Sequence, residues 1–395
     1  MGPIQKITFC IPSKTNLRYL KTALPSIRKN AYRKDHDIIV FVDSDEDGTL
    51  EWLKENAESY GVKYYVNPDL GNSLYGIGRA YDYCINKAET NIVMIFHADM
   101  MLGKDADLHA FKHLKPLSVV CSTRIEPPLH PNGGEKILED FGIWPEEFKE
   151  SEFDAYVDEL IVENKDKTTE GIFAPWMVYK EDIQSIGGHD PMMHSCREDS
   201  DLFNRFVLNG YSLVQSWDSL VYHLTGRGAG SFDGDQERHE KWKADMHNST
   251  KEFIRKWGCG VKHDKMMKPI IPHKYDVEFK VTNADARTIN ILEPWCSRMT
   301  IDCPQAIIDE YIKLEQPNTQ FDLTMRFNTS GESDIMSDII VEFDARSLTQ
   351  NSFNFIQQLS EIFDFNEFDS GQYEFDIFNI KVNRVKHYEG NLINL

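Results

Sequence analysis

At 395 residues the chain is long enough for two domains, and its 41% hydrophobic and 12% aromatic residues can build a globular core. A formal net charge of −21 argues against a protein built to bind nucleic acid or anionic membranes. No apolar run approaches the roughly 20 residues of a membrane-spanning helix.

The first hundred residues alternate strand and helix patterns. Apolar, β-rich runs predict strands, and apolar side chains at helical spacing predict the helices between them. The expected strands cover residues 6–12, 36–49, 62–68 and 91–96, and the expected helices cover 16–30, 49–61 and 77–89. This alternation predicts a mostly parallel sheet with helices on both faces.

Polar residues follow each of these strands. The strand ends carry Pro12-Ser13, Asp43 to Asp47, Asn67 to Gly71, and His97-Ala98-Asp99. Ligands of open parallel sheets bind at the carboxyl ends of the strands. The sequence therefore predicts a binding site that contains these acids and the histidine.

The middle of the chain is less regular. Residues 145–165 indicate an acidic helix, 171–190 a strand, a short helix and a turn at Gly187-Gly188, and 196–211 a helix with an acidic start. Residues 212–231 indicate two short strands that run into a glycine loop, and 237–258 a helix that ends at Gly258.

The composition changes near residue 273. Charged β-rich runs at 275–284, 288–293, 321–328, 338–345 and 373–382 surround one expected helix at 351–363. We therefore expect two domains, residues 1–272 and an acidic α+β module of residues 273–395. An independent module of this kind suggests a role in partner or acceptor contact, and oligomers could form through it.

The seven cysteines are scattered, odd in number and contain no CxxC pair. We interpret them as reduced thiols and expect a cytoplasmic protein. The first residues contain no signal-peptide pattern.

Several motifs together resemble the family-2 glycosyltransferases, which have the GT-A fold. "FCIPSKTN" and "IIVFVDSDEDGT" resemble the first two strand ends of that family, and "NIVMIFHADMML" resembles its D-x-D block. "IGGHDP" and "REDSDLFNRFVLNGY" resemble its acceptor-side turn and acidic helix. The likeness extends over roughly residues 5–258 in the family's order and implies a GT-A catalytic domain.

The resemblance implies a divalent cation, Mn²⁺ or Mg²⁺, at the D-x-D position. Asp99 matches the metal-binding carboxylate, and His223 matches a histidine that completes the metal site in many GT-A enzymes. His97 replaces the first acid of the motif, where we expect it to contact the ribose or a metal-bound water. A cation is needed there because the leaving diphosphate carries about two negative charges.

The nucleotide part of the donor should contact residues on either side of this motif. Asp43 matches the family position that binds the base, and Arg79 and Arg227 are expected near the diphosphate. The full expected set is Pro12, Ser13, Asp43, Asp45, Gly71, Arg79, His97, Ala98 and Arg227.

Transfer to a hydroxyl needs a base, because an alcohol is a poor nucleophile. The resemblance places this base at Asp199, with Glu198 beside it, and a neighbouring carboxylate raises proton affinity. On the acceptor side we expect Trp176, Gly188 and His189 to contact the substrate.

The sequence thus predicts a metal-dependent, inverting glycosyltransferase that moves a sugar from a nucleoside-diphosphate sugar, with UDP favoured, to a glycan, lipid-linked or protein hydroxyl. Two alternatives stay open. One is a sugar-1-phosphate nucleotidyltransferase, although its glycine-rich loop after the first strand is replaced by "IPSKTN". The other is a non-catalytic nucleotide- or glycan-binding module, which the unusual His97 suggests.

Overall fold

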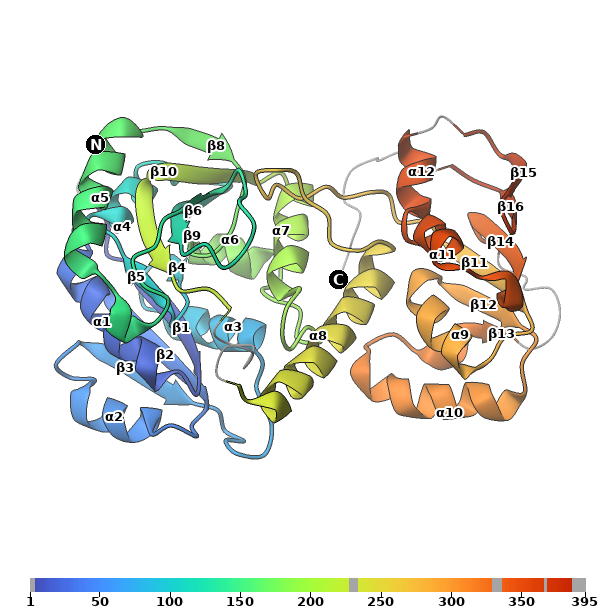
Figure 1. Cartoon of the computed structure of the whole chain (residues 1–395), viewed down its shortest axis with the longest axis horizontal. Helices are drawn as coiled ribbons and strands as arrows, with labels where there is room; N and C mark the ends of the chain where they lie inside the picture. The colour runs from blue at the N-terminus through green and yellow to red at the C-terminus, as the bar shows by residue number, and fades with distance from the viewer. Residues whose placement is uncertain (1–3, 227–233, 329–335, 366–367, 386–395) are drawn as a thin grey trace. The chain divides into compact units, whose positions relative to one another are not determined.

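The N-terminal part of the chain alternates strands and helices, as the sequence predicted (Figure 1). The computed structural model describes residues 4–226, 234–328, 336–365 and 368–385. The first elements are β1 (Thr8–Lys14), α1 (Leu17–Asn30), β2 (Asp37–Ser44), α2 (Thr49–Asn56), β3 (Val62–Val66), α3 (Ile77–Lys87), β4 (Ile92–Ile95), β5 (Met100–Leu102) and α4 (Ala106–Phe111).

The middle of the chain completes the same sheet. It contains β6 (Ser118–Glu126), β7 (Lys136–Leu138), α5 (Glu150–Glu163), β8 (Thr168–Glu170), β9 (Trp176–Tyr179), α6 (Lys180–Ser185), α7 (Glu198–Leu208), β10 (Ser212–His223) and α8 (Gln236–Trp257). Residues 212–223 form one strand instead of the two expected. An irregular stretch between Ser216 and Leu220 interrupts its pairing with β6 but does not end the strand.

The main path of this sheet follows the order β3-β2-β1-β4-β9-β6-β10-β5. Neighbours β3, β2, β1 and β4 are parallel, as are β6 and β10, whereas β9 and β5 run antiparallel to their neighbours. Apolar runs such as β2 are buried along their middle because helices pack on the sheet, α3 on β1 and β2 and α4 on β10. The expected mostly parallel α/β class is confirmed.

The second sheet lies in the C-terminal part of the chain, with the order β13-β12-β11-β14-β16-β15. Its elements are β11 (Val277–Thr282), α9 (Ala286–Leu292), β12 (Arg298–Ile301), α10 (Gln305–Glu315), β13 (Phe327–Asn328), β14 (Ile339–Asp344), α11 (Gln350–Gln357), α12 (Leu359–Phe365), β15 (Gly371–Phe375) and β16 (Phe378–Val382). The expected α+β module is present.

Two details of this module differ from the sequence prediction. The β-rich run 288–293 forms most of α9, because Asp285 caps the helix by accepting a hydrogen bond from the Thr288 amide, and Ile289 and Leu292 are buried on one face. Residues 305–315, for which no element was expected, form α10 with Ile308 and Tyr311 buried. The module therefore has more helices than the one predicted.

The chain divides into two compact units, residues 1–244 with 263–270, and residues 245–262 with 271–394. The second unit thus takes up the C-terminal part of α8, whereas the sequence pattern had suggested a boundary at 272. Charge explains this. The Arg255 side chain is fully buried in the second unit, with Nη2 2.6 Å from Glu293 Oε2 and 2.5 Å from Glu315 Oε1. A buried guanidinium needs carboxylate partners. Residues 245–262, which include Arg255, therefore pack against the rest of the second unit, which contains Glu293 and Glu315.

Within the residues that the structure describes, no helix combines the length and apolar character of a membrane span.

Candidate active site

The turn at residues 97–99 joins β4 to β5 at the carboxyl edge of the first sheet. β5 pairs antiparallel with the end of β10, and in this register Met100 lies opposite His223. The amide of Leu224 donates to the carbonyl of Asp99 at 3.1 Å. Strand pairing therefore places His223 next to Asp99, although more than a hundred residues separate them in the chain.

His97, Asp99 and His223 form one cluster. Their candidate ligand atoms all lie within 4.8 Å of one another, and His223 Nε2 is 3.6 Å from Asp99 Oδ1. The rings of His97 and His223 are 5.6 Å apart. Burial, opposed by Asp99, lowers the pKa of His97 to about 4, so its imidazole is neutral near pH 7 and can act as a ligand. Two imidazole nitrogens and a carboxylate oxygen fit a divalent transition-metal ion.

Glu126 fixes the orientation of His223. Its Oε1 lies 2.9 Å from His223 Nδ1. Burial favours the neutral acid, but the hydrogen bonds from His223 and Lys136 and the electrostatic interactions with His223 and Arg124 outweigh it and lower the pKa of Glu126. An ionised carboxylate can only accept, so Nδ1 carries a proton, and Nε2 is the ring nitrogen that faces Asp99 and can serve as a metal ligand.

Tyr81 of α3 connects this cluster to the start of α7. Its buried ring lies 6.5 Å from that of His97 and 5.7 Å from that of His189. Burial and the charges of Glu198 and Asp99 raise the pKa of Tyr81. Among the described residues, Ser13 Oγ, Tyr81 Oη and Glu198 Oε2 are buried without a hydrogen-bond partner. Such atoms at a strand-end site indicate that it is built for a polar ligand.

Glu198 and Asp199, the two predicted catalytic carboxylates, are the first residues of α7. Burial and the neighbouring charge of Asp199 raise the pKa of Glu198 to about 8. Asp199 is half-buried, and its Oδ1 accepts from the Ser200 amide at 2.6 Å. Cys196 and Arg197 before the helix both have positive φ, of 69° and 73°. Two non-glycine residues in this region are strained, and such strain is concentrated at functional sites.

Asp201, the third acid of this helix start, has a structural role. It is fully buried, and its Oδ2 accepts from Arg205 at 2.8 and 2.9 Å. Arg205 in turn donates to the carbonyls of Ile186 and Gly188.

Asp43 is buried at the end of β2 and holds the loop before α3. Its carboxylate accepts from Asn67 Nδ2 at 3.0 Å and from the amides of Tyr75 and Gly76 at 2.6 and 3.1 Å. The guanidinium of Arg79 lies 4.0 Å from the centre of the Tyr75 ring. Asp43 thus holds the loop that carries Tyr75, against which the Arg79 guanidinium packs.

The other predicted nucleotide contacts are spread around this edge. Pro12 and Ser13 lie near the end of β1, Ala98 is buried within the 97–99 turn, and Asp45 Oδ1 accepts from the Leu50 amide at 3.3 Å. Gly71 is exposed with φ 84°. Arg227 lies outside the described residues.

The predicted acceptor residues are more buried than expected. Trp176 is 1% exposed and packs on Phe203 and Phe206, so it is a core residue and offers no free face to a sugar. This corrects the prediction for Trp176, and the reason is its position on a central strand. His189 is also buried, and both its amide and Nδ1 contact the carboxylate of Asp82, at 2.9 and 2.7 Å.

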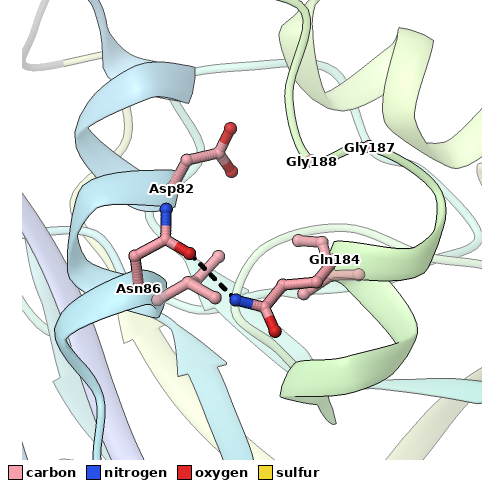
Figure 2. A pocket seen from close by; sticks show the side chains of 7 residues that line it. Asp82, Asn86, Gln184, Gly187 and Gly188 are labelled. Carbon is pink, nitrogen blue, oxygen red and sulfur yellow. Dashed lines mark hydrogen bonds between the residues drawn. The ribbon is translucent and has the colours of Figure 1, made fainter. Parts of the chain in front are cut away.

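A pocket of about 320 Å³ lies beside Asp82 and His189. It is lined by Asp82, Asn86 and Gln184 and by the turn at Gly187-Gly188 (Figure 2). Gln184 Nε2 donates to Asn86 Oδ1 at 2.9 Å across it. Gly188 has φ 69°, and a Cβ there would meet Asp82 Oδ2 at 2.7 Å, so the turn requires glycine.

Sequence reasoning missed Glu126, Tyr81 and Asp82. Glu126 ends a strand, as Asp43 does, and that position was its one available signal. Tyr81 and Asp82 sit inside a helix, where nothing in the pattern separates a site residue from an ordinary one.

Comparison with known families finds a match for part of the first unit. Residues 8–163 match the family described as "Glycosyl transferase family 2". The resemblance drawn from the motifs is confirmed over residues 8–163, and this part of the chain belongs to a glycosyltransferase domain. A comparison with curated proteins finds no match.

Several solved structures are similar over part of the chain. GalNAc-T7, solved with UDP, GalNAc and Mn²⁺, is 11% identical with a TM-score of 0.42 over 63% of this chain and 51% of that one. TarS from S. aureus is 13% identical with a TM-score of 0.41, over 64% and 45%. The mannosyltransferase PcManGT from Pyrobaculum calidifontis, with GDP-Man and Mn²⁺, is 14% identical with a TM-score of 0.43, over 64% and 63%. This chain therefore spans less than two thirds of each.

Proposed function

We propose that the glycosyltransferase domain transfers a sugar, with inversion, from a nucleoside-diphosphate sugar to a hydroxyl acceptor in a metal-dependent reaction. The observation that carries the proposal is the cluster of His97, Asp99 and His223, which stands at the carboxyl edge of the sheet. Asp99 and His97 belong to the segment that matches the family. UDP is the proposed nucleotide.

His97, Asp99 and His223 would hold the cation, which when bound neutralises charge on the diphosphate that leaves. Imidazole ligands favour Mn²⁺ over Mg²⁺. Glu126 keeps His223 in the tautomer that can bind, and Tyr81 packs behind His97. The buried oxygens of Ser13 and Tyr81 that lack partners among the described residues are available to the donor.

Asp199 would take the proton from the acceptor hydroxyl, which then attacks the anomeric carbon opposite the departing diphosphate. Glu198 is protonated below about pH 8, so it can donate a hydrogen bond from the atom that lacks a partner in the described structure. Asp199 thus supplies the general base, and the adjacent Glu198 supplies a hydrogen-bond donor.

Asp43 and Arg79 are proposed to shape the nucleotide side, and the turn at Gly188-His189 the acceptor side. The acceptor would be a glycan, a lipid-linked or a protein hydroxyl. The second unit is proposed as a domain for acceptor contact or oligomer formation, and the buried or half-buried free thiols suit a cytoplasmic protein.

Screening nucleotide sugars for release of nucleoside diphosphate tests the proposal. We expect release with one donor in the presence of Mn²⁺ and none with EDTA or with Asp99→Ala. Binding of UDP without release from any sugar donor would favour a non-catalytic binding module. Pyrophosphate formation from a nucleoside triphosphate and a sugar 1-phosphate would favour a nucleotidyltransferase.

A further inference from the structure

A second group of potential metal ligands lies elsewhere in the first unit. Donor atoms of His113, Asp166 and Asp218 all lie within 4.8 Å of one another. His113 is in the turn after α4, Asp166 is between α5 and β8, and Asp218 is in the irregular part of β10. Three segments distant in sequence therefore bring ligating side chains to one place.

The ammonium group of Lys112 already lies against this cluster. Lys112 Nζ lies 3.4 Å from Asp166 Oδ1, 3.7 Å from Asp218 Oδ2 and 3.0 Å from His109 Nδ1. Asp218 is fully buried and Lys112 is on a flexible stem. The two carboxylates therefore attract positive charge, and the Lys112 ammonium, which lies against both of them, would compete with a bound cation.

Hydrogen bonds to both carboxylate oxygens hold Asp218 in place. Its Oδ1 accepts from Ser216 Oγ at 2.7 Å, and its Oδ2 accepts from the Asp166 amide at 2.9 Å. His109, one helical turn before His113, lies with Nδ1 3.1 Å from the same Oδ2. Hydrogen bonds of this kind hold ligands in place and tune their strength.

We propose that His113, Asp166 and Asp218 form a second divalent-metal site, able to take Zn²⁺, which becomes available when the Lys112 ammonium moves into solvent. One imidazole and two carboxylates are common zinc ligands, with bonds of about 2.0–2.2 Å, and water takes the fourth position. The donor atoms, which lie within 4.8 Å of one another, must move closer together to reach this geometry. Bound zinc would tie the turn after α4, the loop before β8 and β10 together.

Calorimetric titration of the full chain with zinc chloride alone tests this, in an Asp99→Ala, His223→Ala background that removes the candidate active-site ligands. We expect Asp166→Ala to weaken zinc binding at least tenfold. The Asp166 side chain is 54% exposed, so this variant should fold. We expect Lys112→Gln to tighten binding about tenfold, because the competing ammonium is removed.

The matched control is Asp158→Ala, which removes an equally exposed acid, 55% exposed, from a helix outside the cluster. It should bind zinc as the background does. Equal zinc affinities in the Asp166 and Asp158 variants would overturn the proposal of a second site. Unchanged or weaker zinc binding in Lys112→Gln would also overturn it. Thermal unfolding with and without zinc provides a second readout, since a ligand of the folded state raises Tm.

Discussion

His223 Nδ1 lies 2.9 Å from Glu126 Oε1, so the opposite nitrogen of the ring faces Asp99. Glu126 also accepts from Arg124 at 2.8 Å and from Lys136 at 3.0 Å. The two cations keep the carboxylate ionised and in place. The orientation of His223 therefore depends on a residue outside the cluster of His97, Asp99 and His223.

The first prediction concerns the hydrogen bond between Glu126 and His223. Glu126→Gln should weaken Mn²⁺ binding about 10- to 100-fold, because the amide no longer fixes the His223 tautomer. Calorimetry with Mn²⁺ in the presence of UDP measures the effect. Glu135→Gln is the control, since Glu135 contacts Arg124 but not His223. Equal losses in both variants would assign the effect to the charge network and not to His223.

The second prediction separates the three proposed metal ligands. Asp99→Ala should abolish metal-stimulated activity, and His223→Ala should weaken Mn²⁺ binding strongly. Because His97 lies within the same cluster, His97→Ala should weaken binding as much as His223→Ala does. His97→Asp should keep the metal, since a carboxylate is also a ligand. If His97→Ala binds Mn²⁺ normally, the role of His97 is limited to the ribose or a metal-bound water.

The third prediction concerns the base. Asp199→Asn should leave donor binding nearly intact and lower turnover by roughly two to four powers of ten, the range of a lost general base. Initial rates at saturating donor and a UDP titration measure the two effects. Glu198→Gln keeps a hydrogen-bond donor and should cost less. Near-normal turnover in Asp199→Asn would transfer the role to Glu198.

The fourth prediction concerns stability and pH. Burial raises the pKa of Glu198 from 4.5 in the unfolded chain to about 8, so the folded state favours the protonated acid. Its contribution is complete below pH 4.5 and is lost as the pH rises to about 8. Glu198→Gln cannot ionise, so relative to wild type it should gain stability across this window, on the order of a few kcal/mol.

Urea unfolding of wild type and Glu198→Gln at pH 5 and pH 8.5 measures that gain as a difference in the free energy of unfolding. The comparison between variants removes the contribution of titrating groups that do not interact with Glu198. A difference that does not change with pH would show that Glu198 is ionised in the folded state.

The fifth prediction tests the buried charge network of the second unit. Glu293→Ala should destabilise this unit by about 3–5 kcal/mol, because it removes the buried carboxylate that the guanidiniums of Arg255 and Arg326 share, although Arg255 keeps its contact with Glu315. Glu342→Ala is the control, since its pair with Lys280 is exposed and worth at most about 1 kcal/mol. Similar midpoints of denaturant unfolding in the two variants would contradict the assignment.

The sequence by itself determined the order of strands and helices through residue 96 and the polar character of the strand ends. Both follow from local periodicity, because apolar spacing decides which face of a segment is buried. Motif order then indicated a glycosyltransferase, and it identified Asp99 and His223 as a pair. Local pattern failed at 288–293, where the Asp285 cap and a buried helix face outweighed β propensity.

Only the tertiary structure decided which side chains share the site. The register of β5 on β10 brings His223 to Asp99, and the parallel pairing of β6 with β10 brings Glu126 to His223. It also placed Trp176 in the core and residues 245–262 in the second unit. Register and burial arise from contacts between distant segments, and a one-residue shift in pairing would turn these side chains to the other face of the sheet.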